Sequence, residues 1–105
     1  MRILFDQGTP VPLRHSVTSH VVSTAFEMGW STLDNGDLLR ASELQFDVFI
    51  TTDQNLKHQQ NLTGLLIAIL VLPSANWPEL QKHLSAVVSA VESLQPGDYV
   101  ELSLP

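Results

Sequence analysis

Three aspartates have the type and the spacing to bind a metal ion together. Asp6 follows the apolar run at residues 3–5, Asp53 follows the run at residues 48–52, and Asp37 opens a helix-like stretch between them. Strands that each end in a carboxylate bring both acids to one edge of a parallel sheet, where open α/β sheets bind ligands. Carboxylates gathered there are typical ligands of a hard divalent cation such as Mg²⁺. We therefore predict a site at this edge.

Each of these acids also has a purely local interpretation. Asp6 can cap the next helix or accept hydrogen bonds from turn amides, and Asp53 can cap the polar segment that follows it. Asp37 lies in a first helical turn, where the helix dipole favours an acid whatever its role. Asp34 competes with Asp37 for a functional role. The sequence leaves these alternatives open for each residue taken alone.

Electrostatics makes the combined interpretation testable. Three carboxylates within a few ångströms repel one another, which raises at least one pKa and costs stability. A bound divalent ion reverses that cost. We therefore predict that Mg²⁺ or Mn²⁺ stabilises the protein.

Basic side chains are expected near the same edge of the sheet. Lys57 and His58 follow Asp53 within about one helical turn, and Arg14 belongs to the connection after Asp6. These three residues are the candidates for binding a substrate phosphate, and a solvated polar face is the alternative. The four histidines lack metal-ligand spacing, and the chain has no glycine-rich phosphate loop and no cysteine for thiol catalysis.

Strand-like and helix-like segments alternate along the chain. A Thr9-Pro10 pair looks like a helix cap followed by proline in the first turn of a helix. The next helix along the chain is expected to bury Leu38, Ala41 and Leu44 or a neighbour. Strands are predicted at residues 1–5, 20–25, 46–52, 65–72 and 99–104, and helices at residues 10–16, 37–44, 54–61 (one or two turns) and 77–94 (four turns on one apolar face).

This order predicts an α/β fold in a single domain spanning residues 1–105. Alternation of strands and helices indicates a mainly parallel sheet of about five strands, with helices on both faces and right-handed crossovers. The final strand, with alternating apolar residues, looks like a half-exposed edge strand that can run in either direction.

Composition narrows the function classes. The chain has 105 residues, no cysteine and a net charge of −6, with 11 acidic residues against five Lys and Arg. This balance argues against broad phosphate-driven binding of nucleic acid, which needs clustered cations. The longest apolar run, residues 65–73, is too short to span a membrane, and only three apolar residues lie between Arg2 and Asp6. We expect a cytoplasmic protein that does not enter a membrane.

Three motifs resemble a known group. Residues 3–8, 35–39 and 50–56 resemble the short bacterial PIN-like proteins, which are related to PIN-domain nucleases and to the toxins of toxin–antitoxin pairs. The resemblance implies a three-layer PIN-like (Rossmann-like) sandwich. It implies that Asp6, Asp37 and Asp53 are catalytic ligands of Mg²⁺ or Mn²⁺, that RNA is the substrate, and that a small antitoxin-type protein is a partner.

The chain also departs from that pattern. Gln7 stands where relatives often have a second acid, and Gln54 and Asn55 are neutral where full nucleases usually bring a fourth acid. A metal-dependent ribonuclease is the first hypothesis. The alternative is a catalytically inactive PIN-like module that acts through protein contacts, for example along the edge strand at residues 99–104. A phosphoryl-accepting receiver domain fits less well, because Lys82 is the only lysine after Lys57. Homodimerisation through the last strand or the long helix is left open.

Overall fold

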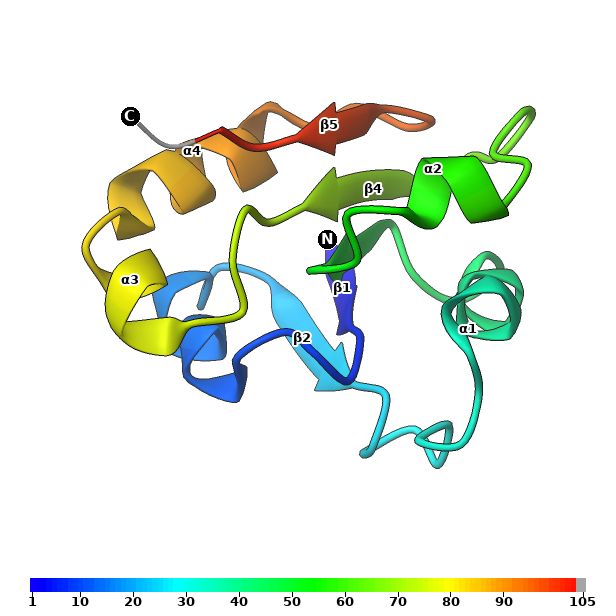
Figure 1. Ribbon diagram of the computed structural model, residues 1–105, viewed down its shortest axis with the longest axis horizontal. Coiled ribbons are helices and arrows are strands. Elements are labelled where there is room, and N and C mark those ends of the chain that lie inside the picture. The colour runs from blue at the N-terminus through cyan, green and yellow to red at the C-terminus, as the bar shows by residue number, and fades with distance from the viewer. Residues whose placement is uncertain (104–105) are drawn as a thin grey trace.

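The computed structural model describes residues 1–103, which form a sheet and its flanking helices (Figure 1). The predicted edge strand extends to Leu104, and that residue lies outside the described part. No helix in residues 1–103 is long and apolar enough to cross a membrane. The strands are β1 (Arg2–Phe5), β2 (Val21–Thr24), β3 (Val48–Thr51), β4 (Ala68–Val71) and β5 (Tyr99–Glu101), and the helices are η1 (Val11–Ser16), α1 (Asn35–Ser42), α2 (Leu56–Gln59), α3 (Trp77–Gln81) and α4 (Leu84–Ser93).

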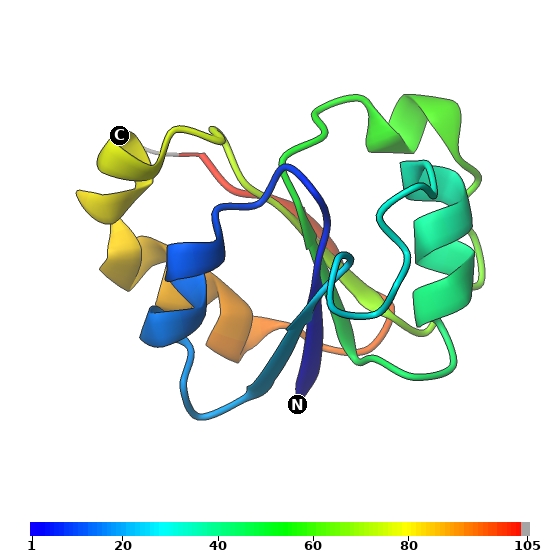
Figure 2. The same cartoon turned by 90° about the horizontal axis from the view of Figure 1, so that it is seen from below.

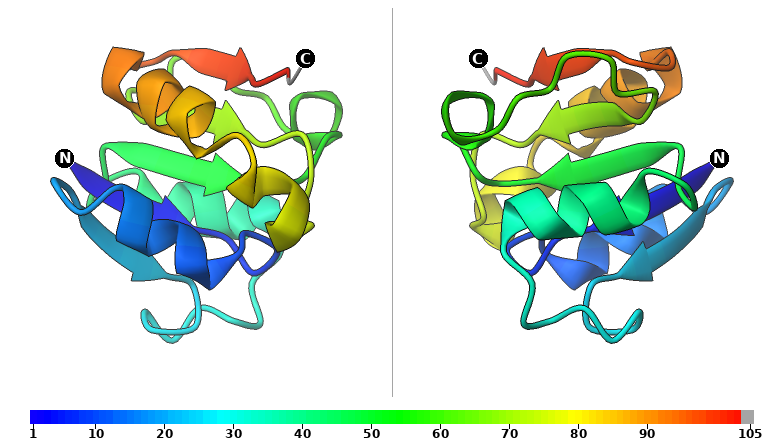
Figure 3. Two further views of the ribbon diagram at one scale, coloured as in Figure 1. Left: turned by 90° about the vertical axis from the view of Figure 1, so that its left-hand side faces the viewer. Right: turned by 90° about the vertical axis from the view of Figure 1, so that its right-hand side faces the viewer.

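All five strands are parallel and lie in the order β2-β1-β3-β4-β5. Their arrows point the same way in Figure 3. The predicted α/β class, the five strands and the parallel sheet are confirmed, and the direction of β5, which the sequence left open, is parallel. From β1 the chain passes outward to β2. It then returns to β3 on the other side of β1, and β4 and β5 follow in that direction. The strand order therefore reverses between β1 and β3.

Helices cover both faces of the sheet, which gives three layers (Figure 2). Alternate residues of each strand enter opposite cores because side chains in a strand alternate between faces. Ile3 and Ile50 pack with α3, α4 and η1, whereas Leu4 and Phe49 pack with α1 and α2. Every residue of β3 and β4 is buried, as expected for central strands covered on both sides.

One connection departs from the predicted right-handed crossovers. The steps from β3 to β4 and from β4 to β5 move toward the same edge of the sheet. However, α2 packs on one face and the α3–α4 segment packs on the other (Figure 2). The two connections therefore have opposite hands, and β4–β5 breaks the usual rule. A physical reason is coverage, since the face that α3 and α4 cover otherwise carries only the short η1.

Two helix predictions are wrong in detail. The segment after Pro10 is a 3₁₀ helix without a side-chain cap, and the Thr9 hydroxyl bonds to Asp6. The long amphipathic helix is interrupted, because α3 ends at Gln81 and α4 starts at Leu84. Its apolar spacing nevertheless places Leu80 and Val87 in one core. The start of this segment is as predicted, since Asn76 caps α3.

Helix α1 begins as predicted and buries part of the predicted face. The Asp34 carboxylate accepts a hydrogen bond from the Asp37 amide and caps the helix. Leu38 and Leu39 are buried, whereas Leu44 is 96% exposed. Burial of Leu38 is confirmed, and Ala41 is half-buried. The third expected position, Leu44 or a neighbour, fails at Leu44, because the helix ends at Ser42 and the chain turns away before that residue.

Two leucines test the assignment of the core. Replacing the fully buried Leu70 by alanine is expected to lower the free energy of unfolding by about 2–5 kcal/mol, because the cavity adds to the lost burial. Leu66→Ala is the matched control and should change it by less than about 0.5 kcal/mol, because Leu66 is 76% exposed. Urea unfolding followed by circular dichroism measures both. Equal losses would contradict the assigned core.

Candidate functional site

Asp6 is a buried carboxylate at the carboxyl end of β1. Its side chain is 5% exposed, and hydrogen bonds satisfy both oxygens. Oδ1 accepts from the Thr9 amide at 3.0 Å and from the Thr9 hydroxyl at 2.6 Å, and Oδ2 accepts from the Thr51 hydroxyl at 2.5 Å. A buried charge is tolerated only when it is bonded in this way. The register that pairs Phe5 with Ile50 places Asp6 opposite Thr51.

Asp53 lies beside Asp6 because Thr51 joins them. The same Thr51 hydroxyl that donates to Asp6 accepts a hydrogen bond from the Asp53 amide at 3.0 Å. The Asp53 carboxylate is half-buried and accepts from the Asn35 side-chain amide at 3.0 Å and from the Asn55 backbone amide at 2.9 Å. Three parts of the chain thus meet at one place. They are the segment after β1, the segment after β3 and the first residue of α1.

The place where they meet is the point at which the strand order reverses. In open α/β sheets the crevice beyond the carboxyl ends of the strands, at such a point, is the usual ligand site. Gly8 lets the loop after β1 pass closely over it, since a Cβ there would lie 2.6 Å from the Thr52 hydroxyl. We therefore define the acidic site as Asp6, Thr51, Asp53 and Asn35.

The contacts of Asp37 are separate from those of the acidic site. Its carboxylate, 53% exposed, forms an ion pair with Arg40 on the surface of α1. Within residues 1–103, no three His, Cys, Asp or Glu side chains are grouped closely enough to hold a metal ion. The structure thus links Asp6 with Asp53, and a metal-ligand role of Asp37 stays a prediction. The i,i+3 spacing of Asp37 and Arg40 was a signal for this pair.

Arg14 is paired at the β2 edge of the sheet. Its guanidinium donates to both carboxylate oxygens of Glu27, at 3.1 and 2.5 Å, and to the Val22 carbonyl at 3.0 Å. These hydrogen bonds from Arg14, with one from the Thr24 amide, lower the pKa of Glu27 from 4.5 to about 2. This ion pair ties the connection after β1 to β2, and its role in substrate binding stays a prediction.

Lys57 and His58 belong to α2, the short helix that follows Asp53. The Lys57 ammonium lies 2.6 Å from the Glu101 carboxylate of β5. Hydrogen bonding to Lys57 lowers the pKa of Glu101, and the charge of His58 contributes in the same direction. Lys57 is therefore close to the carboxyl end of the sheet, and the roles of Lys57 and His58 in substrate binding stay predictions.

Sequence reasoning missed two members of the acidic site. Thr51 looked like part of a buried strand, although a hydroxyl at the end of an otherwise apolar run was an available signal. Asn35 was recognised only as a possible helix cap, and Asp34 performs that role instead. Asn35 is thereby free to bond to Asp53, 18 residues further along the chain.

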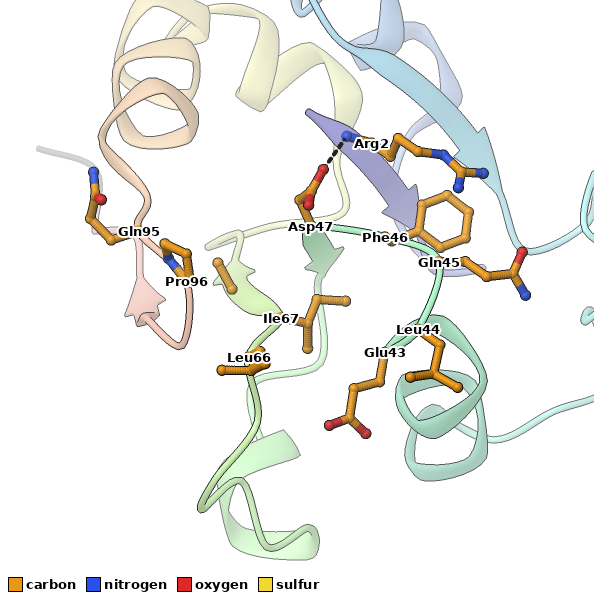
Figure 4. Close-up of a pocket in the computed structure, with 11 residues that line it drawn as sticks. Arg2, Glu43, Leu44, Gln45, Phe46, Asp47, Leu66, Ile67, Gln95 and Pro96 are labelled. Carbon is orange, nitrogen blue, oxygen red and sulfur yellow. Dashed lines mark hydrogen bonds between the residues drawn. The ribbon is translucent and has the colours of Figure 1, made fainter.

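A pocket of about 390 Å³ opens at the opposite edge of the sheet (Figure 4). It lies at the amino ends of the strands, between Phe46 and Pro96, and includes the exposed Leu44 and Leu66. The Arg2 guanidinium lies over the Phe46 ring, 5.0 Å from its centroid. This pocket shares no residue with the acidic site.

No protein-family model, no curated protein and no solved structure shows a significant match to this chain. The function is therefore inferred from the residues and their geometry.

Thr51→Val tests whether the shared hydroxyl holds the acidic site together. Valine keeps the shape of the fully buried side chain but leaves an oxygen of Asp6 without its donor. We expect the free energy of unfolding to fall by about 1–3 kcal/mol, measured by urea unfolding. The control Thr52→Val should stay within about 0.5 kcal/mol of the native protein. Equal effects of the two variants would show that the hydroxyl bridge is unimportant.

The Arg14–Glu27 pair predicts a defined acid dependence. Since folding lowers the pKa of Glu27 from 4.5 to about 2, its stabilisation is complete above pH 4.5 and is lost as the pH falls toward 2. Glu27→Gln should therefore lower the melting temperature above pH 4.5 and flatten its decline in that window. Thermal melts across the window measure this effect, with Glu43→Gln as the control. A native-like decline in Glu27→Gln would refute the assignment.

Proposed function

We propose that the protein is a Mg²⁺- or Mn²⁺-dependent ribonuclease of the PIN-like type. The observation that carries the proposal is the juxtaposition of Asp6 and Asp53 through Thr51 at the reversal of strand order. The motif resemblance at residues 3–8, 35–39 and 50–56 supports the choice of RNA as substrate.

The donor chemistry of the acidic site fits a hard divalent ion. Mg²⁺ is commonly held by one or two carboxylates, with water and substrate phosphate completing its shell. Asp6 and Asp53 would supply the carboxylate oxygens, and Asp37 would join them only after leaving Arg40. When bound, the ion lowers the pKa of a water molecule and stabilises charge on the phosphodiester.

The chain's own residues would orient the carboxylates. Thr51 and Thr9 fix both oxygens of Asp6, so that this carboxylate cannot rotate freely. The Asn35 side-chain amide donates to one oxygen of Asp53. Partners that hold metal ligands in this way commonly change affinity or activity by about 10- to 100-fold. The resemblance extends the proposal to a toxin restrained by a small antitoxin-type protein.

The second candidate function is an inactive module that acts through protein contacts. The observation in its favour is the pocket at the opposite edge of the sheet, where Leu44 and Leu66 are exposed at 96% and 76%. Large exposed apolar side chains gathered at one place are typical of interaction surfaces. This function would need no metal response and no RNA cleavage.

The ribonuclease proposal predicts cleavage that depends on both linked acids. The native protein with millimolar Mg²⁺ or Mn²⁺ should cut a fluorescent single-stranded RNA, and EDTA should stop the reaction. Asp6→Asn and Asp53→Asn should each reduce the rate by more than about 100-fold, since losing a ligand exceeds losing a supporting hydrogen bond. Gel analysis of the RNA measures the rates.

Glu43→Gln is the matched control, because it removes one negative charge at the opposite edge of the sheet. It should leave the rate unchanged and reveals any contaminating nuclease. Thermal melts should show that metal stabilises the native protein and not Asp6→Asn. Cleavage that survives EDTA or both asparagine variants, or no cleavage with no metal-induced shift, would reject the proposal.

A further inference from the structure

An ion pair connects α2 to the edge strand next to the acidic site. Lys57 lies one turn beyond Asp53, and its ammonium is 2.6 Å from a carboxylate oxygen of Glu101 in β5. The protein has five Lys and Arg residues. Of these, Lys57 lies in α2, the short helix that follows Asp53. Its positive charge is thus occupied by a carboxylate of the same chain.

Tyr99 adds an unusual buried donor at this place. Its hydroxyl is buried and faces the Glu101 carboxylate, but it makes no well-formed hydrogen bond within residues 1–103. Burial raises the pKa of Tyr99 to about 12, and the negative charges of Glu101 and Asp53 and the contact with Glu101 add to the rise. Tyr99 and Glu101 point to the same face of β5, because residues two apart in a strand do so. The phenol therefore lies near both acids.

A buried hydroxyl without a well-formed hydrogen bond is rare in a folded protein and requires an explanation. Here a cation and an O–H donor both face one carboxylate, that of Glu101. This is the donor set of an anion-binding site, with the Glu101 carboxylate in the position of the anion.

We propose that Lys57 and Tyr99 form a phosphate-binding subsite beside Asp53, and that Glu101 occupies the place of an RNA phosphate in the free protein. This inference rests on the proposed function for its substrate class. A backbone phosphate displaces the Glu101 carboxylate from Lys57 and accepts from the Tyr99 hydroxyl the well-formed hydrogen bond that Glu101 does not provide in the free protein.

Exchange of this kind is energetically accessible. The Lys57 and Glu101 side chains are 45% and 37% exposed, and exposed ion pairs contribute little net stability. An incoming phosphate therefore competes with a weakly held carboxylate. Glu101 sets a threshold for binding, which keeps the acidic chain from holding phosphates that do not reach the Tyr99 hydroxyl.

Fluorescence anisotropy with a labelled single-stranded RNA, in EDTA so that no cleavage occurs, tests the proposal. Glu101→Gln should bind RNA about two- to fivefold more tightly than the native protein, since the competing carboxylate is gone. Glu92→Gln is the matched control, because Glu92 is also a half-exposed acid, and its carboxylate lies 2.8 Å from His20 Nε2 on the other face of the sheet. It should not reproduce the gain. Equal gains in the two variants would reduce the effect to net charge and overturn the proposal.

Two further variants separate a binding role from a structural one. Lys57→Gln combined with Glu101→Gln should lose the gain and lower the dependence of log affinity on log salt by about 0.7, the value for one phosphate contact in single-stranded nucleic acid. Tyr99→Phe should not lower the melting temperature, because the hydroxyl makes no well-formed hydrogen bond in the free protein, and should weaken RNA binding in the Glu101→Gln background about twofold or more.

The outcomes distinguish this inference from the proposed function. Metal-dependent cleavage without a gain in Glu101→Gln would overturn the subsite alone. A gain that depends on Lys57, in a protein that does not cleave RNA, would support the subsite and reject the ribonuclease. A gain that persists when Lys57 is replaced would also overturn the subsite.

Discussion

Parallel pairing of β1 with β3 is the interaction on which the candidate site depends. The register that sets Phe5 beside Ile50 brings the residue after β1 opposite the last residue of β3. Asp6 thereby reaches the Thr51 hydroxyl, and Thr51 in turn receives the Asp53 amide. A shift of one residue would turn these side chains to the other face of the sheet. The two apolar cores hold this register, because each strand contributes alternate residues to both of them.

Hydrogen bonding decides how the protein keeps acids at this place. Asp6 is almost fully buried, and three donors from two threonines compensate for the water it has lost. Asp53 remains half-buried and receives its donors from Asn35 and Asn55. Neither carboxylate uses a cation for this purpose. The site is therefore negative and ordered, which is the condition that a divalent ion requires of oxygen ligands.

Three cationic side chains of the protein form ion pairs with acids other than Asp6 and Asp53, which limits the positive charge that a ligand would meet. Arg14 stabilises the connection to β2 through Glu27, and Arg40 pairs with Asp37 on α1. Lys57 is close to the acids but is engaged by Glu101. An acidic protein of this kind has little general affinity for phosphates. Recognition of a nucleic acid would then depend on a few well-placed groups, and the buried Tyr99 hydroxyl is a group for which folding alone provides no well-formed hydrogen bond.

Local patterns in the sequence determined the α/β class, the alternation of elements and the positions of Asp6 and Asp53 at strand ends, because apolar periodicity and capping residues act over a few neighbours. The helix break after Gln81 and the exposure of Leu44 escaped these patterns, since they depend on where the chain packs. Only the tertiary structure decided which strands are neighbours, and with them the contacts of Thr51, Asn35 and Tyr99. Those contacts join residues 18 to 45 positions apart or depend on burial by remote segments. No local pattern encodes such distances, because the packing of the whole sheet sets them.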